Sequence, residues 1–76
     1  MNPELIILRT LQPNYPRGLR ENVLRCEVPS YGAELTLTDL LRHAKNLESK
    51  RQITITAGED YTLYKITPDG LSRLSE

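Results

Sequence analysis

The segment 36–51 constrains the fold of this chain more than any other, because its apolar residues repeat with a helical period. They recur at steps of three and four residues, at Leu37, Leu40, Leu41, Ala44 and Leu47. At about 100° per residue they form one stripe along a helix, and that stripe must face a core. Thr36, followed three residues later by Asp39, is typical of a capped helix start. We therefore predict an amphipathic helix over residues 36–51.

After Arg51 the hydrophobic period changes from helical to two. Isoleucine and threonine alternate over residues 53–56, and a second alternating segment covers residues 61–66. Residues 57–60 between them are of types common in turns. Two alternating segments joined by a short turn predict a β-hairpin.

The pattern also predicts a register for this hairpin. With a turn centred on Gly58 and Glu59, Thr56 faces Tyr61 across the strands. The apolar side then carries Ile53, Ile55, Thr62, Tyr64 and Ile66.

The remaining elements are shorter. Asn2 before Pro3 predicts the start of a helix over residues 3–12, and this helix is apolar over more than half its surface, which favours a central position or an oligomer contact. A weaker helical pattern predicts a second helix over residues 19–28, and Glu34–Leu35 is expected to form a very short strand. Thr67-Pro68-Asp69 has the same order of capping residue, proline and acidic residue as Asn2-Pro3-Glu4, and it predicts a last short helix.

Length and composition limit the functions open to the chain. Its 76 residues allow one domain, residues 1–76. Ten basic and ten acidic residues cancel, so any nucleic-acid binding must rest on a local patch. Cys26 is the only cysteine, which excludes an internal disulfide and, without a signal peptide, leads us to expect a cytoplasmic setting. The longest apolar run, Leu5–Leu8, is too short to cross a membrane.

The order helix, helix, helix, hairpin, short helix resembles the winged helix-turn-helix domain. The motifs that carry the resemblance are the helix 36–51, the hairpin with its Gly58-Glu59-Asp60 turn, and residues 64–74, which are similar to the y-x-l-T-x-x-G-x-x-x-L segment of bacterial and phage regulators. Residues 5–11 are similar to the first helix of the same group. The pattern covers nearly the whole chain and most resembles small stand-alone winged-helix proteins of Mu-like phages and prophages. It implies an α+β fold with a three-helix bundle, a β-hairpin wing and a short C-terminal helix.

In that family the third helix enters the major groove of double-stranded DNA. The resemblance implies that Arg42 and Asn46 contact base edges. Arg can form two hydrogen bonds with the edge of guanine, and Asn can form two with the edge of adenine. It also implies phosphate contacts from Thr38, Lys45, Ser49, Lys50 and Arg51. The chain would then be a transcriptional regulator or a phage accessory factor, and a dimer, because one such domain covers only a short site.

The tip of the predicted wing favours a different interpretation. Glu59 and Asp60 lie there without a nearby cation, and phosphates would repel them. A protein-interaction module with no DNA contact suits this tip and the zero net charge. Helix 3–12, or Tyr61 and Leu63 of the hairpin, would then supply a surface for a second copy or a protein partner.

Several residues have a plain structural explanation. The polar face of helix 36–51 is also typical of a solvated surface, with ion pairs from Glu48 to Lys45 or Arg51, although the resemblance favours nucleic-acid contact. The single histidine, His43, is expected at the surface, and Cys26 is expected to be a small buried hydrophobe. We find no catalytic set and no glycine-rich phosphate loop, so we expect no enzymatic activity, no cofactor and no metal.

Overall fold

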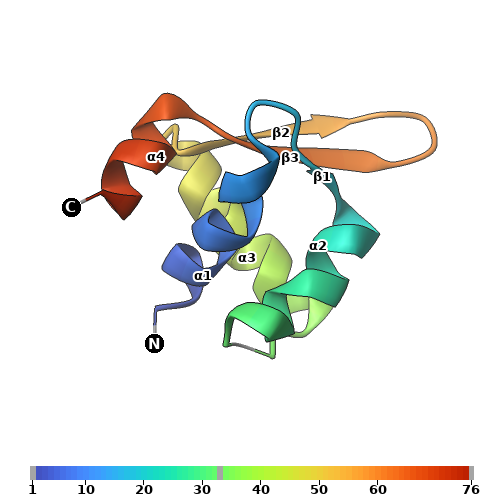
Figure 1. Cartoon of the computed structure of the whole chain (residues 1–76). Helices are drawn as coiled ribbons and strands as arrows, with labels where there is room; N and C mark the ends of the chain where they lie inside the picture. The colour runs from blue at the N-terminus through green and yellow to red at the C-terminus, as the bar shows by residue number, and fades with distance from the viewer. Residues whose placement is uncertain (1, 33, 76) are drawn as a thin grey trace.

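The computed structural model describes residues 2–32 and 34–75, which form an α+β fold. Three helices pack into a bundle, an antiparallel sheet covers one side of it, and the last helix lies at the end of the sheet away from the hairpin tip (Figure 1). In chain order the elements are α1 (Pro3–Leu11), the 3₁₀-helix η1 (Gln12–Asn14), β1 (Leu19–Arg20), α2 (Glu21–Glu27), the 3₁₀-helix η2 (Val28–Tyr31), α3 (Leu37–Ser49), β2 (Ile53–Ala57), β3 (Thr62–Ile66) and α4 (Pro68–Leu74).

Three helices begin where their capping residues predict. The side chain of Asn2 accepts a hydrogen bond from the Glu4 amide at 2.9 Å, and Thr67 caps α4 in the same way through the Gly70 amide at 3.2 Å. Thr36 caps α3 by accepting from the Asp39 amide at 3.1 Å. Each cap satisfies an amide that has no partner inside its helix. The predicted starts of α1, α3 and α4 are therefore confirmed, and α3 ends two residues earlier than expected, at Ser49.

The sheet has three strands, in the order β1-β3-β2, where the sequence predicted a two-stranded hairpin. Leu19 pairs with Tyr64, and Arg20 pairs with Leu63. The helix predicted over residues 19–28 is therefore wrong at its start, because its first two residues form β1. The strand predicted at Glu34–Leu35 is also wrong, since these residues lie in neither helix nor strand. Two-residue strands carry no periodicity, and pairing with β3 decides where one forms.

The hairpin register differs by two residues from the predicted one. Thr56 faces Leu63 instead of Tyr61, because the turn contains the four residues 58–61 and is closed by a 2.8 Å hydrogen bond from the Gly58 amide to the Tyr61 carbonyl. A shift by two keeps every side chain on its face, since side chains alternate with a period of two. Ile53 and Ile55 thus still face the core, opposite Ile66 and Tyr64.

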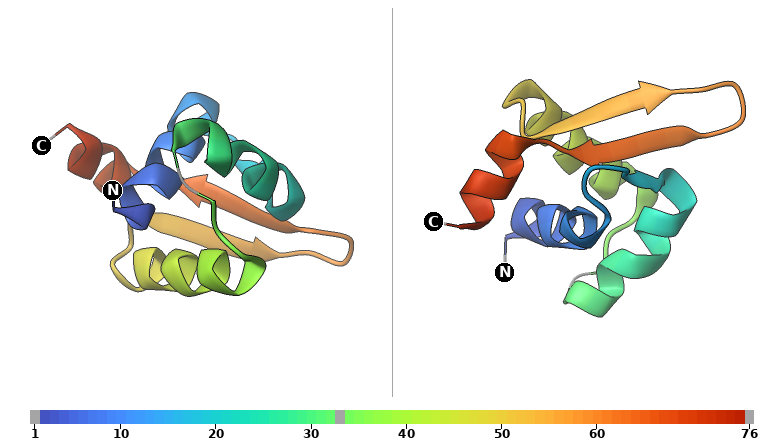
Figure 2. Two further views of the ribbon diagram at one scale, coloured as in Figure 1. Left: turned by 90° about the horizontal axis from the view of Figure 1, so that it is seen from below. Right: turned by 45° about the horizontal axis from the view of Figure 1, so that its top comes forward.

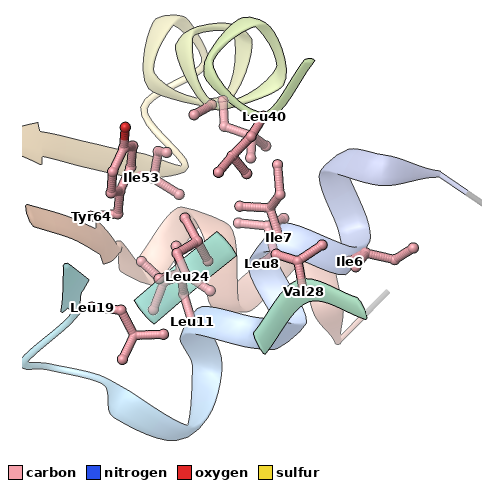
Figure 3. Close-up of a cluster of buried hydrophobic side chains, with 13 residues drawn as sticks. Ile6, Ile7, Leu8, Leu11, Leu19, Leu24, Val28, Leu40, Ile53 and Tyr64 are labelled. Carbon is pink, nitrogen blue, oxygen red and sulfur yellow. The ribbon is translucent and has the colours of Figure 1, made fainter. Parts of the chain in front are cut away.

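The core lies between the bundle and the inner face of the sheet (Figure 3). It is built from aliphatic side chains of all three bundle helices together with Tyr64 of β3. The largest fully buried hydrophobic side chains are Ile6, Ile7, Leu8, Leu11, Leu24, Val28, Leu40, Leu47, Ile53 and Tyr64. The one buried polar side chain among the described residues, Thr10, donates a 2.7 Å hydrogen bond to the Ile6 carbonyl. The expected central position of α1 is confirmed. Across residues 2–32 and 34–75, no helix is long and apolar enough to span a bilayer.

The apolar stripe of α3 is shorter than its sequence pattern. Leu40, Ala44 and Leu47 are buried, whereas Leu37 is 38% exposed. Leu37 is the first residue of the helix, and the first fully buried member of the stripe follows three residues later. Three buried positions at steps of four and three residues are enough to hold α3 against the bundle with one face outward.

Candidate nucleic-acid interface

The outward face of α3 carries five of the seven residues that the resemblance implies. Thr38, Arg42, Lys45, Asn46 and Ser49 are all exposed. At about 100° per residue they fall within an arc of about 100°, centred opposite the buried stripe. The other two, Lys50 and Arg51, are also exposed but lie in the turn between α3 and β2. The helix therefore presents the five together, and the turn places the last two beside its C-terminal end.

Two of the cations on this surface form ion pairs. Arg42 donates from Nη2 to Oδ1 of Asp39 at 3.1 Å, and the two side chains are 66% and 41% exposed. Lys50 donates from Nζ to Oε1 of Glu4 at 3.0 Å. The Arg42 pair is largely solvated, so it holds its cation weakly and leaves Arg42 able to exchange partners with a phosphate. Glu4 is only 13% exposed, so its pair with Lys50 is less screened by solvent.

Glu4 of α1 connects this turn to the C-terminal helix. Its Oε1 also accepts from Nη1 of Arg73 at 2.8 Å, and the same Arg73 nitrogen donates to the side chain of Gln52 at 2.8 Å. Burial raises the pKa of Glu4, but the hydrogen bonds from Arg73 and Lys50 outweigh burial, so that its pKa is lowered from the ordinary value of 4.5. Lys50 thus belongs to a structural cluster, which sequence reasoning missed because its members are far apart in the chain.

The other predicted contact residues near the C-terminal end of α3 differ in how many hydrogen bonds they already make within the chain. The Ser49 hydroxyl donates to the Asn46 carbonyl at 2.7 Å, so part of its hydrogen-bonding capacity is already used. Arg51 has a left-handed backbone with φ 61°, and its carbonyl accepts from the Thr67 hydroxyl at 2.7 Å. The side chains of Lys45 and Asn46 make no ion pair or hydrogen bond to another described residue. The expected pairs of Glu48 with Lys45 or Arg51 are likewise not formed within the described part of the chain.

The wing carries the opposite charge at its tip. Glu59 and Asp60 are both exposed in the turn. Beside them the guanidinium of Arg20 lies over the ring of Tyr61, with its central carbon 4.2 Å from the ring centroid. An open hollow of about 200 Å³ is bordered here by Arg20, Glu21, Asn22, Asp60, Tyr61 and Thr62. Sequence reasoning missed this contact, because it depends on the pairing of β1 with β3.

The predictions for His43 and Cys26 have different outcomes. His43 is half-buried on the flank of α3, close to its expected position. Cys26 is exposed on α2, so its predicted burial is wrong. The reason is that α2 is only seven residues long and buries a single residue, Leu24. Among the described residues, no group of three or more His, Cys, Asp and Glu side chains is placed to hold a metal ion.

A helical bundle, an antiparallel sheet with a projecting hairpin and a closing helix together define the winged-helix fold. Two solved structures share it with this chain. Bordetella bronchiseptica BpsR, solved in work on the regulation of its DNA binding by 6-hydroxynicotinic acid, has a TM-score of 0.80 at 11% identity over 99% of this chain and 50% of that chain. F93 from STIV, a winged-helix DNA-binding protein, has a TM-score of 0.78 at 21% identity over 93% of this chain and 77% of that chain.

Both similarities have low sequence identity, and they cover different shares of the two neighbours. This chain spans half the length of the BpsR chain that it matches. No protein-family model and no curated protein sequence matches it. The likeness therefore establishes the fold, and the function has to be argued from the residues on α3.

Proposed function

We propose that this chain binds double-stranded DNA by placing α3 in the major groove. The observation that carries the proposal is the outward face of α3, where Arg42, Lys45 and Asn46 are exposed on the side opposite the buried stripe. A helix with a free face of this kind fits the width of the major groove, and Arg and Asn side chains match the edges of guanine and adenine. The described DNA binding of the two structural neighbours supports the same proposal.

The resemblance and the chemistry of each side chain support separate roles for these residues. We assign base contacts to Arg42 and Asn46, and phosphate contacts to Thr38, Lys45, Ser49 and Arg51. Lys50 contributes less, because Glu4 competes with phosphate for its ammonium group. A role as transcriptional regulator or phage accessory factor extends the proposal and rests on the resemblance to winged-helix proteins of Mu-like phages.

A salt titration of binding to a mixed-sequence duplex tests the proposal. The logarithm of the binding constant should fall steeply with the logarithm of salt concentration, because bound cations displace counterions. The double substitution Arg42→Ala plus Lys45→Ala should weaken binding and flatten the slope by about one to two. Arg9→Ala plus Arg17→Ala removes the same charge from exposed positions outside α3 and serves as the matched control. Failure to bind at low salt, or equal losses in both double variants, would refute groove binding by α3.

The second candidate function is a protein-interaction module. The exposed acidic pair Glu59–Asp60 at the wing tip favours it, because this tip would be repelled by a DNA backbone. Binding of the chain to a basic protein segment, unaffected by Arg42→Ala plus Lys45→Ala but lost on reversal of Glu59 and Asp60, would support this module over the DNA-binding protein.

A further inference from the structure

The turn 50–52, between α3 and β2, closes the C-terminal end of α3 as a Schellman motif. The Arg51 amide donates to the Glu48 carbonyl at 2.9 Å, and the Gln52 amide donates to the Leu47 carbonyl at 3.0 Å. These two hydrogen bonds define the motif, and the residue just beyond its cap has a left-handed backbone that glycine usually provides. In this chain Arg51 occupies that position, with φ 61°.

An arginine at this position costs folding free energy that a glycine would not. The Cβ of an L residue is crowded in the left-handed region, whereas glycine has no Cβ. Within residues 2–32 and 34–75, the exposed side chain of Arg51 forms no hydrogen bond or ion pair that would compensate the fold. Backbone conformations of this kind, held by surrounding contacts, cluster at ligand contacts and other functional sites.

Hydrogen bonds from α4 and its capping residue hold this turn. The Thr67 hydroxyl donates to the Arg51 carbonyl at 2.7 Å, and the Thr67 amide donates to the Gln52 carbonyl at 3.0 Å. Arg73 of the same helix donates to the Gln52 side chain at 2.8 Å. Gly70 lies so close to the Gln52 carbonyl that a Cβ would not fit between them. Figure 2 shows α4 at the end of the sheet where β2 begins, opposite the hairpin tip.

We propose that α4 is a positioning element for DNA binding, in which Thr67 holds Arg51 in its left-handed conformation so that the guanidinium contacts a DNA phosphate. This role rests on the proposed binding of α3 in the major groove and adds to it the residue that directs one of the contacts. Arg51 follows the end of α3 and is exposed there. A phosphate contact from a fixed backbone loses less conformational entropy on binding than one from a mobile turn.

Arg51→Gly measures the cost of the arginine in the absence of DNA. Glycine keeps the left-handed backbone without crowding, so the midpoint of thermal unfolding should rise by about 4 °C. Arg17→Gly is the matched control, since it removes an exposed arginine whose φ is not positive. Glycine at position 17 should not raise the midpoint, because it only adds freedom to the unfolded chain. A midpoint of Arg51→Gly at or below that of the parent chain would overturn the proposal.

DNA binding by the same variants measures what Arg51 contributes. Arg51→Gly should bind a mixed-sequence duplex about threefold more weakly than the parent chain, with the salt slope lowered by about one, whereas Arg17→Gly should bind like the parent. Binding that is lost with Arg42→Ala plus Lys45→Ala but unaffected by Arg51→Gly would overturn the positioning role and leave the proposed function intact. Failure of the parent chain to bind would overturn both.

A double-mutant cycle tests whether Thr67 acts through Arg51. Thr67→Val removes the hydroxyl and should weaken DNA binding by nearly the same factor as Arg51→Gly. Thr67→Ser keeps the hydroxyl and should retain binding. Added to Arg51→Gly, Thr67→Val should weaken binding no further, because the residue that it positions is already gone. If Thr67 served only to cap α4, Thr67→Val would weaken binding alike in both backgrounds, and that result would overturn the proposal.

Discussion

The hydroxyl of Tyr64 donates a 3.1 Å hydrogen bond to Oε1 of Glu21, and this bond ties the middle strand of the sheet to the first turn of α2. Tyr64 is completely buried, and it is the only aromatic ring in the core among the described residues. It pairs with Leu19 on one side and with Ile55 on the other. The residue therefore connects both edges of the sheet to the helical bundle.

We predict that this bond makes stability sensitive to alkaline pH. Burial, then the nearby Glu21 carboxylate, raises the pKa of Tyr64 from 10.0 to about 12. The unfolded chain loses the proton first as pH rises, so stability is full below pH 10.0 and is lost as pH approaches 12. Tyr64→Phe should remove this alkaline loss and cost about 1 kcal/mol near neutral pH. Urea unfolding of both proteins at several pH values measures the two effects, and an unchanged alkaline dependence in Tyr64→Phe would contradict the assignment.

At acid pH we expect Glu4 to contribute. Its pKa is lowered in the folded chain, so the unfolded chain takes up the proton first when pH falls. The stability contributed by Glu4 is therefore present above its ordinary pKa of 4.5 and is lost as pH falls through the folded value. Glu4→Gln should reduce this acid dependence and lower stability at neutral pH by about 1 kcal/mol. Urea unfolding of both proteins at several acid pH values measures the change, and an acid dependence of Glu4→Gln equal to that of the parent chain would contradict the role of Glu4.

Gly18 is predicted to be intolerant of substitution. Its φ is +104°, which other residues rarely adopt, and a Cβ there would lie 2.5 Å from the backbone carbonyl oxygen of Tyr64. Gly18→Ala should therefore destabilise the chain by about 2 kcal/mol or more, because relief requires β1 to move away from β3. Thermal unfolding checks the change. A variant as stable as the parent would show that β1 is not held against β3 at this point.

For the proposed DNA interface we predict that Lys45 and Asn46 have separable effects. Lys45→Ala should weaken binding to all duplexes alike and reduce the salt slope by about one, as expected of a phosphate contact. Asn46→Ala should leave the slope unchanged but cost about 1–3 kcal/mol of discrimination against a changed base pair. Binding to a duplex selected from a random pool and to single-base variants of it measures both. Identical behaviour of the two variants would contradict these assignments.

The sequence alone determined the elements whose signals lie in neighbouring residues. Thr36, Thr67 and Asn2 predicted three helix starts, because a capping hydrogen bond spans two or three residues. The leucine spacing of α3 predicted its buried and exposed faces, and alternation predicted the faces of the hairpin strands. Resemblance to the winged-helix pattern joined these elements into the correct fold, which the structural neighbours support.

Only the tertiary structure decided the contacts between distant segments. The pairing of Leu19 with Tyr64, the stacking of Arg20 on Tyr61 and the cluster around Glu4 leave no periodic trace in the chain. The exposure of Cys26 likewise depends on how few residues of α2 reach the core. Helix caps and amphipathic periods are properties of a single segment, whereas strand pairing and side-chain burial depend on free energy gained between segments that folding brings together.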